Sequence, residues 1–175
     1  MNACVEHELV RVAEAMPARR KLAFRCRDGK RQCDKFEVPV ISVKQPWAWL
    51  IANGHQDILS RHSGTAVRGV VLVYAAREWD KRDFEIASDL AWAMQVDGMP
   101  LPQELNCGGI VGVAWVKDCV QQSDSLWFTG PHGIVLGYAR PVQFVQMDEV
   151  KGAGNARMFK AELSRMEACQ FGLIT

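Results

Sequence analysis

Three β-rich stretches follow one another in the second half of the sequence, and they constrain the fold more than any other feature. They are residues 108–120, 126–139 and 140–147, separated only by glycine, proline and short polar segments. Connections this short join strands that pair antiparallel, because a parallel pair needs a longer crossover. We therefore expect an antiparallel sheet here rather than a doubly wound parallel one.

The first half of the sequence alternates strand-like and helix-like segments. Runs of β-branched residues mark the strands, whereas apolar residues three or four positions apart mark the helices. The expected elements are strands at 38–43, 57–62 and 68–76, helices at 46–53 and 80–94, and a loop leading into a C-terminal helix at 154–169. This order predicts an α+β domain whose sheet is mixed but mainly antiparallel and curves into an open barrel.

Charge divides the chain into two segments. Residues 1–36 hold 9 Lys and Arg against 5 Asp and Glu, whereas residues 37–175 hold 12 against 15. We expect a basic N-terminal arm with a short helix at 1–36 and one folded domain at 37–175, since 175 residues suffice for a single core. The mildly acidic body lacks the strong basic field of a dedicated duplex-DNA binder.

The sequence also bears on compartment and cofactors. No apolar run approaches the roughly 20 residues that span a bilayer. Two of the first ten residues are glutamates, where a signal peptide would need an apolar stretch. We expect a cytoplasmic protein with no membrane partner, so its six cysteines should be free thiols. Cys26 and Cys33, even with Cys4 and His7, lack the spacing of a zinc site, and we expect no metal and no cofactor.

Three segments of the sequence resemble one known family. Residues 40–61, VISVKQPWAWLIANGHQDILSR, followed by RGVVLVYAA at 68–76, resemble the opening of the ASCH (activating signal cointegrator homology) family of the PUA-like superfold. Residues 126–144 resemble the closing strands of that family, and the resemblance spans about residues 38–160. It implies a barrel of five to six strands with flanking helices, a cleft between the barrel and the first helix, and binding of RNA or modified nucleosides.

The departures from the family pattern concern its chemistry. The family has Gly-x-Lys-x-x-Glu-x-Arg after the first helix, and this chain has Gly54, Gln56, Leu59 and Arg61 at those positions. In relatives that deacetylate 4-acetylcytidine, the lysine activates a threonine at the position of the glutamate. Glutamine accepts no proton at neutral pH and leucine is no nucleophile, so we expect this chain to lack the lysine-dependent amidohydrolase chemistry.

The remaining polar and aromatic residues of this region form a candidate binding set. An indole stacks on a base, a guanidinium pairs with phosphate, and amides and hydroxyls bond to base edges. The expected ligand-binding residues are Gln45, Trp47, Gln56, Arg61, Thr65, Arg68 and Tyr74. In the helix expected at 46–53, Trp49 shares one face with Leu50 and Asn53, so we expect its side chain in the core. Arg61 has a second interpretation, as a brace that bonds to Asp57 or to backbone carbonyls.

The sequence thus predicts an ASCH domain protein that binds RNA or a nucleotide-like ligand and contains no identifiable catalytic residue. One alternative is a ribonuclease or amidohydrolase on the same scaffold that uses Tyr74, His62 or His132. Another is a protein-interaction module that makes contact through the arm. The three hypotheses differ in whether RNA is bound intact, turned over or ignored.

Overall fold

The computed structural model describes residues 35–147 and 158–173 of the chain. The predictions for the basic arm, its short helix and the three cysteines before residue 35 lie outside the described residues. Within the described chain, the three cysteines Cys107, Cys119 and Cys169 form no disulfide.

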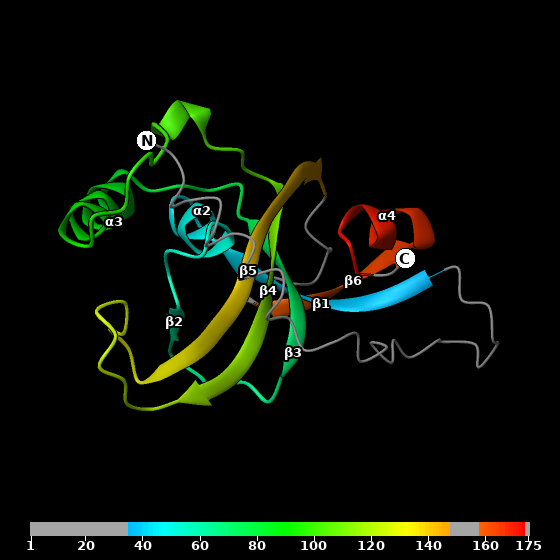
Figure 1. Ribbon diagram of the computed structural model, residues 1–175, viewed down its shortest axis with the longest axis horizontal. Helices are drawn as coiled ribbons and strands as arrows, with labels where there is room; N and C mark the ends of the chain where they lie inside the picture. The colour runs from blue at the N-terminus through cyan, green and yellow to red at the C-terminus, as the bar shows by residue number, and fades with distance from the viewer. Residues whose placement is uncertain (1–34, 148–157, 174–175) are drawn as a thin grey trace, which may run out of the picture.

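Six strands form one mixed sheet in the order β2-β5-β4-β3-β1-β6. Their bounds are β1 Lys35–Val43, β2 Ile58–Arg61, β3 Gly69–Ala75, β4 Gly109–Val120, β5 His132–Gln146 and β6 Met158–Ser164. β1 and β3 pair parallel, whereas the other described pairs are antiparallel. The sheet is strongly curved (Figure 1), but β2 and β6, at its two ends, do not pair with each other in the described chain. The expected α+β class and mainly antiparallel pairing are confirmed.

Three α-helices flank the sheet, and local signals define their ends. They are α2 Trp47–Ala52, α3 Lys81–Ala93 and α4 Arg165–Gln170, with a 3-10 turn η1 at Pro102–Glu104. The Asp80 carboxylate accepts a hydrogen bond from the backbone of Arg82 and caps α3, as its sequence predicts. In Figure 1, α2 and α3 lie on one side of the sheet and α4 lies on the other.

Three strand predictions need correction. The stretches at 126–139 and 140–147 contain one continuous strand, β5, because register shifts against β4 bend the pair without interrupting it at Pro141. The segment expected to be a loop before the last helix contains β6, which pairs antiparallel with β1. β1 begins at Lys35, ahead of the strand expected at 38–43, because Lys35 pairs with Ser164 at the end of β6.

Alternation along the strands divides the buried side chains between the two faces of the sheet. We call the cluster on the α2 side the inner core; it consists of Ile41, Val43, Ala48, Ile51, Leu59, Val71, Val73, Ala75, Ala114, Val116, Ile134 and Leu136. The outer core consists of Val38, Val40, Val70, Leu72, Tyr74, Ile110, Val113, Ala161, Leu163 and Phe171. In β3, the odd-numbered residues therefore face α2 and the even-numbered ones face away.

Candidate ligand-binding cleft

A cleft of about 1010 Å³ opens where α2 and α3 meet the carboxyl ends of β1 and β3. Because these two strands are parallel, both end at this edge, where the backbone of Ala76 donates to the oxygen of Val43 at 2.9 Å. The chain leaves β1 into α2 and leaves β3 toward α3, and such an edge is where sheets with parallel strands form ligand crevices. The cleft is lined by Ser42, Val43, Lys44, Trp47, Gln56, Leu59, Ser60, Arg61, Ala76, Arg77, Glu78, Asp83, Ile86, Leu90, Trp127 and Thr129.

Two tryptophans form the aromatic part of the cleft lining. Trp47, on α2, is half-buried and packs against the inner core, while Trp127 comes from the connection between β4 and β5 and is buried. Their ring centroids are 6.1 Å apart and the rings are nearly perpendicular at 88°, an edge-to-face contact. Ile86 and Leu90 of α3 add apolar surface to the same cleft.

Hydrogen bonds anchor the segment around Trp127 to β2. The Ser60 hydroxyl donates to the backbone oxygen of Trp127 at 3.2 Å and accepts from the backbone of Thr129 at 2.8 Å. Just before β2, the Asp57 carboxylate accepts from the Ser125 hydroxyl at 2.8 Å. Trp127 is therefore held in place by residues that lie far from it in the sequence.

Gln56 is buried, with only 5% of its surface exposed. Its Nε2 donates to the backbone oxygen of Ile58 at 2.9 Å, which fixes the orientation of the amide. The Oε1 atom of Gln56 and the Nε1 atom of Trp127 are both buried and have no hydrogen-bond partner among the described residues. An unpaired polar atom in such a place costs about 1–3 kcal/mol, so both atoms call for an explanation.

Arg61 lines the cleft and also braces it. Its Nη2 donates to the backbone oxygen of Ser42 at 2.8 Å. This is the kind of contact that the second interpretation of Arg61 predicts, in which the guanidinium bonds to a backbone carbonyl.

Charges of both signs line the cleft. Lys44 forms an ion pair with Asp83 of α3, with Nζ and Oδ2 3.4 Å apart and both side chains partly exposed. Exposed pairs of this kind contribute about 0–1 kcal/mol. Arg61 and Arg77 are the other cations of the lining and Glu78 is its second carboxylate, so neither sign dominates.

Four of the expected ligand-binding residues do not line this cleft, and for Gln45 and Tyr74 the reason is their own packing. Gln45 is buried, donates through Nε2 to the oxygen of Asn106 at 2.7 Å and accepts at Oε1 from the backbone of Trp49 at 3.1 Å. It lines a second hollow of about 250 Å³, together with the half-buried Trp49. Tyr74 is fully buried in the outer core against Phe159, because even-numbered residues of β3 face away from the cleft.

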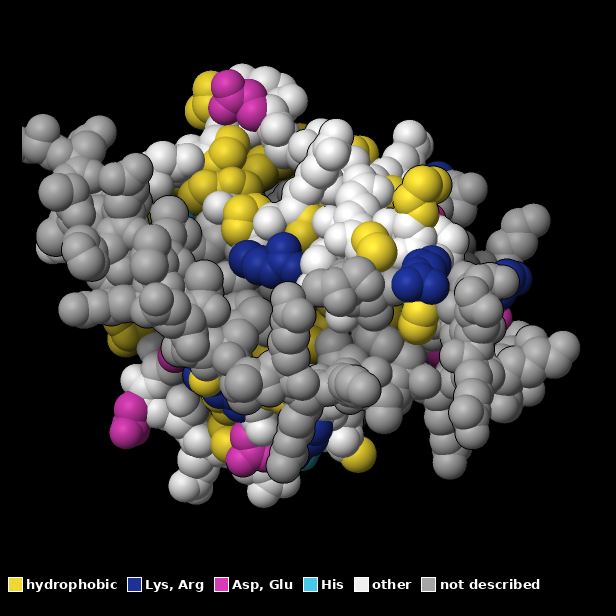
Figure 2. Space-filling model, turned by 45° about the vertical axis from the view of Figure 1, so that its right-hand side comes forward, with side chains coloured by type: hydrophobic (Ala, Val, Ile, Leu, Met, Phe, Trp, Pro, Cys, Tyr) yellow, Lys and Arg dark blue, Asp and Glu magenta, His cyan; other side chains and the backbone are white. Residues whose placement is uncertain are grey.

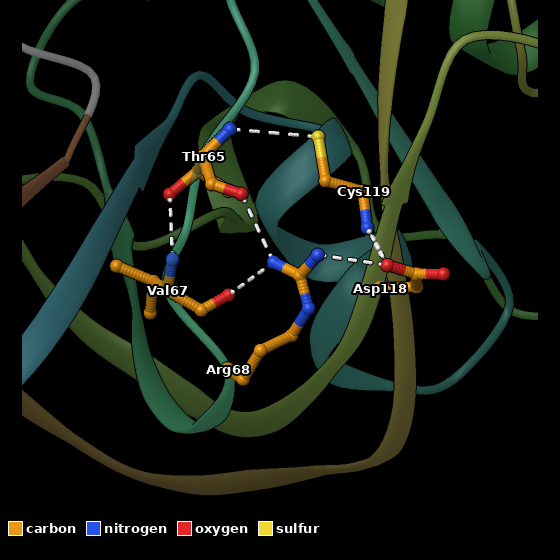
Figure 3. A network of polar contacts seen from close by, with 5 residues as sticks. All are labelled: Thr65, Val67, Arg68, Asp118 and Cys119. Atoms are coloured by element: carbon orange, nitrogen blue, oxygen red, sulfur yellow. Dashed lines mark hydrogen bonds and ion pairs between the residues drawn. The ribbon is translucent and has the colours of Figure 1, made fainter.

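Thr65 and Arg68 belong to a separate network that folds the connection between β2 and β3 onto β4 (Figure 3). Arg68 donates to the backbone oxygens of Thr65 and Val67, each at 2.9 Å, and its Nη2 lies 2.7 Å from Oδ1 of Asp118. The same oxygen accepts from the backbone of Cys119, and this bond, followed by that of Arg68, lowers the pKa of Asp118. Neither Thr65 nor Arg68 lines the cleft.

The residues of the alternative enzyme hypothesis do not converge on the cleft either. His62 is exposed after the end of β2, His132 is half-buried at the start of β5, and Tyr74 lies in the outer core. Within residues 35–147 and 158–173, no group of three or more His, Cys, Asp and Glu could hold a metal ion. In the same residues, no helix has the length and apolar character needed to cross a membrane.

The structure also adds cleft residues that the sequence interpretation did not select. Trp127 and Ser60 are the main ones, and their contact joins residues 67 positions apart. The only local signal was the segment SLWFT at 125–129, in which serine and threonine flank the last tryptophan of the sequence.

Comparison with protein-family models found no match to this sequence, and comparison with curated proteins found no similar one.

Proposed function

We propose that this chain is an ASCH-type domain of the PUA-like superfold that binds single-stranded RNA or a nucleoside-like ligand in the cytoplasm. The observation that supports the proposal best concerns the residues that stand at the positions of the family's lysine, glutamate and arginine. Gln56, Leu59 and Arg61 all line one cleft, together with Trp47 of the Gln-Pro-Trp segment. The segment that resembles the family thus lines this cleft, which is larger than the hollow beside Gln45.

The lining of the cleft fits an aromatic ligand. Its volume of about 1010 Å³ accommodates a nucleoside, and small-molecule sites have roughly 300–1,000 Å³. The half-buried Trp47 offers part of an indole face, and stacking one base on such a face is worth about 1–3 kcal/mol. The mixed charges agree with a ligand recognised by stacking and hydrogen bonds more than by a strong field.

The charges of the described residues on one face of the molecule do not favour duplex binding. On the described part of the face in Figure 2, lysine and arginine side chains stand apart, interspersed with hydrophobic and acidic ones. A duplex binder gathers its cations in a continuous patch or stripe. A single-stranded or nucleoside ligand can be bound with less positive charge on the protein surface.

The same positions argue against hydrolysis by the family mechanism. Leu59 is buried in the inner core, and the Gln56 amide donates to a backbone oxygen. Neither side chain can act as a base or a nucleophile. The proposed activity is therefore binding without turnover.

Titration of the full chain with short single-stranded RNA and with the four ribonucleosides tests this proposal. Calorimetry should detect saturable binding, and a denaturing gel should show the RNA intact after prolonged incubation. Trp47→Ala should weaken binding, whereas Trp92→Ala, at a ring 84% exposed outside the cleft, is the matched control. Cleaved RNA would favour the enzyme alternative, and no binding of any of these probes would exclude the proposed function.

A further inference from the structure

Two residues of the cleft lining each have a buried polar atom without a partner in the described chain, and the two atoms are of opposite kind. Gln56 Oε1 is a hydrogen-bond acceptor and Trp127 Nε1 is a donor, on side chains that are 5% and 4% exposed. We propose that these two atoms recognise the uncharged hydrogen-bonding edge of a heterocycle, so that the cleft selects a nucleobase and leaves any phosphate outside. This inference rests on the proposed function and specifies what its ligand must present.

The energetic argument depends on burial. A buried donor or acceptor without a partner costs about 1–3 kcal/mol, whereas a neutral hydrogen bond returns only about 0.5–1.5 kcal/mol net. A ligand that pairs both atoms removes the penalties, and a ligand that lacks either group leaves one of them in place. The two atoms thus discriminate between ligands more strongly than they contribute to affinity.

Both side chains are held in position without a ligand. The Gln56 amide is oriented by its bond to Ile58, and the Gln56 backbone donates to the oxygen of Leu50 at 3.2 Å. The Trp127 indole packs edge-to-face with Trp47, and its backbone oxygen accepts from Ser60. Such fixed groups bind with little loss of conformational entropy.

The charged groups of the cleft do not favour phosphate as the main determinant. Lys44 is paired with Asp83, and Arg61 donates to the backbone oxygen of Ser42. Asp83 and Glu78 both belong to the lining, so a phosphate beside Arg77 would meet carboxylates as well. A neutral ring avoids that repulsion, since like charges in one cleft are unfavourable.

A nucleobase offers the required complement. Its edge places a donor next to an acceptor, as an exocyclic amine beside a ring nitrogen or as a ring N–H beside a carbonyl. The donor would pair with Gln56 Oε1 and the acceptor with Trp127 Nε1. Inorganic phosphate and ribose 5-phosphate lack this planar edge and serve as negative probes.

Nuclear magnetic resonance of the indole N–H groups tests the inference directly. The chain has six tryptophans, and Trp127→Phe identifies the signal of Trp127. On titration of the full chain with each ribonucleoside, the Trp127 N–H signal should move downfield with at least one of them, while that of Trp92 stays in place. No movement at a saturating concentration of a nucleoside that binds would overturn the inference. A water molecule that stays bound to this N–H in the complex would also overturn the inference.

Affinity measurements on variants provide a second test. Trp127→Phe removes the donor and keeps an aromatic ring, and Gln56→Met removes the acceptor at similar length; each should weaken nucleoside binding roughly 3- to 10-fold. Trp49→Phe makes the same ring change in the second hollow and should leave affinity unaltered. Melting curves establish that each variant is folded at the assay temperature.

The outcomes separate the two proposals. If nucleosides bind and Trp47→Ala weakens binding, but Trp127→Phe and Gln56→Met do not, this inference fails and the proposed function stands. Competition by inorganic phosphate or ribose 5-phosphate as strong as that by the nucleoside also overturns the inference alone. If neither RNA nor any nucleoside binds, both proposals fail.

Discussion

The Arg61 guanidinium donates to the backbone oxygen of Ser42, and this bond joins two strands that are not neighbours in the sheet. β2 forms one end of the strand order, while β1 lies next to the other end. The curvature of the sheet brings the two strands together, and the side chain spans the remaining gap at the edge of the cleft. Arg61 thus stabilises the shape of the cleft, whether or not it also contacts a ligand.

Replacing Arg61 should therefore affect stability first. Arg61→Gln loses a hydrogen bond from a charged group in a half-buried site, and we expect the free energy of unfolding to fall by about 1.5–3 kcal/mol. Urea unfolding measures this, and Arg68→Gln, an exposed arginine outside the cleft, should cost less. Unchanged stability together with reduced RNA affinity would show that Arg61 acts through the ligand instead.

Trp47 should contribute mainly to binding. Trp47→Ala removes the stacking surface, and we expect the affinity of the folded protein for single-stranded RNA or a nucleoside to fall by about 1–3 kcal/mol. Because the ring is half-buried against the inner core, the variant should also be less stable, so calorimetry must be performed well below its melting temperature. Wild-type affinity in the folded variant would contradict a stacking role.

The lysine-dependent deacetylation should be absent. Purified protein should release no acetate from 4-acetylcytidine, because Gln56 and Leu59 cannot act as base and nucleophile. Gln56→Lys alone should not create the activity, since Leu59 remains buried in the inner core. Chromatography of the nucleoside after long incubation detects turnover, and cytidine formation by the natural sequence would show that the motif is interpreted wrongly.

Local signals predicted much of the fold, whereas contacts between distant residues were beyond them. The helix starting near Asp80 and the strand Gly69–Ala75 follow from capping and β-branched runs. β6 was missed because it is partly exposed and defined by its pairing with β1. The parallel pairing of β1 with β3, which creates the cleft, is likewise a tertiary feature that no local pattern marks.

The candidate site shows the same division. Trp47, Gln56 and Arg61 lie close together in the sequence, and the structure brings all three to the cleft. Tyr74 lies in the outer core and not in the cleft, and its position could not be predicted because a strand pattern gives alternation but does not tell which face of the sheet borders the cleft. Trp127 was missed because its place in the lining depends on contacts with β2 that only the folded chain forms.

The stacking of His55 on Trp49 predicts a pH dependence of stability. His55 stacks on Trp49, with ring centroids 5.3 Å apart and an angle of 27°, and burial lowers the pKa of its imidazole. Because the unfolded chain titrates near the ordinary value of about 6.5, the unfolded state binds protons more readily than the folded state. The contribution of His55 is therefore complete above that pH and decreases as the pH falls through it toward the folded-state pKa.

Urea midpoints measured between about pH 7.5 and about pH 5 test this linkage. His55→Phe keeps a ring on Trp49 without a titrating group, so the variant should gain stability relative to the natural sequence as the pH falls. Trp49→Leu removes the ring that covers His55 and should reduce the pH dependence in the natural histidine background. A stability difference between His55→Phe and the natural sequence that stays constant across this range would mean that the imidazole has the same pKa in both states.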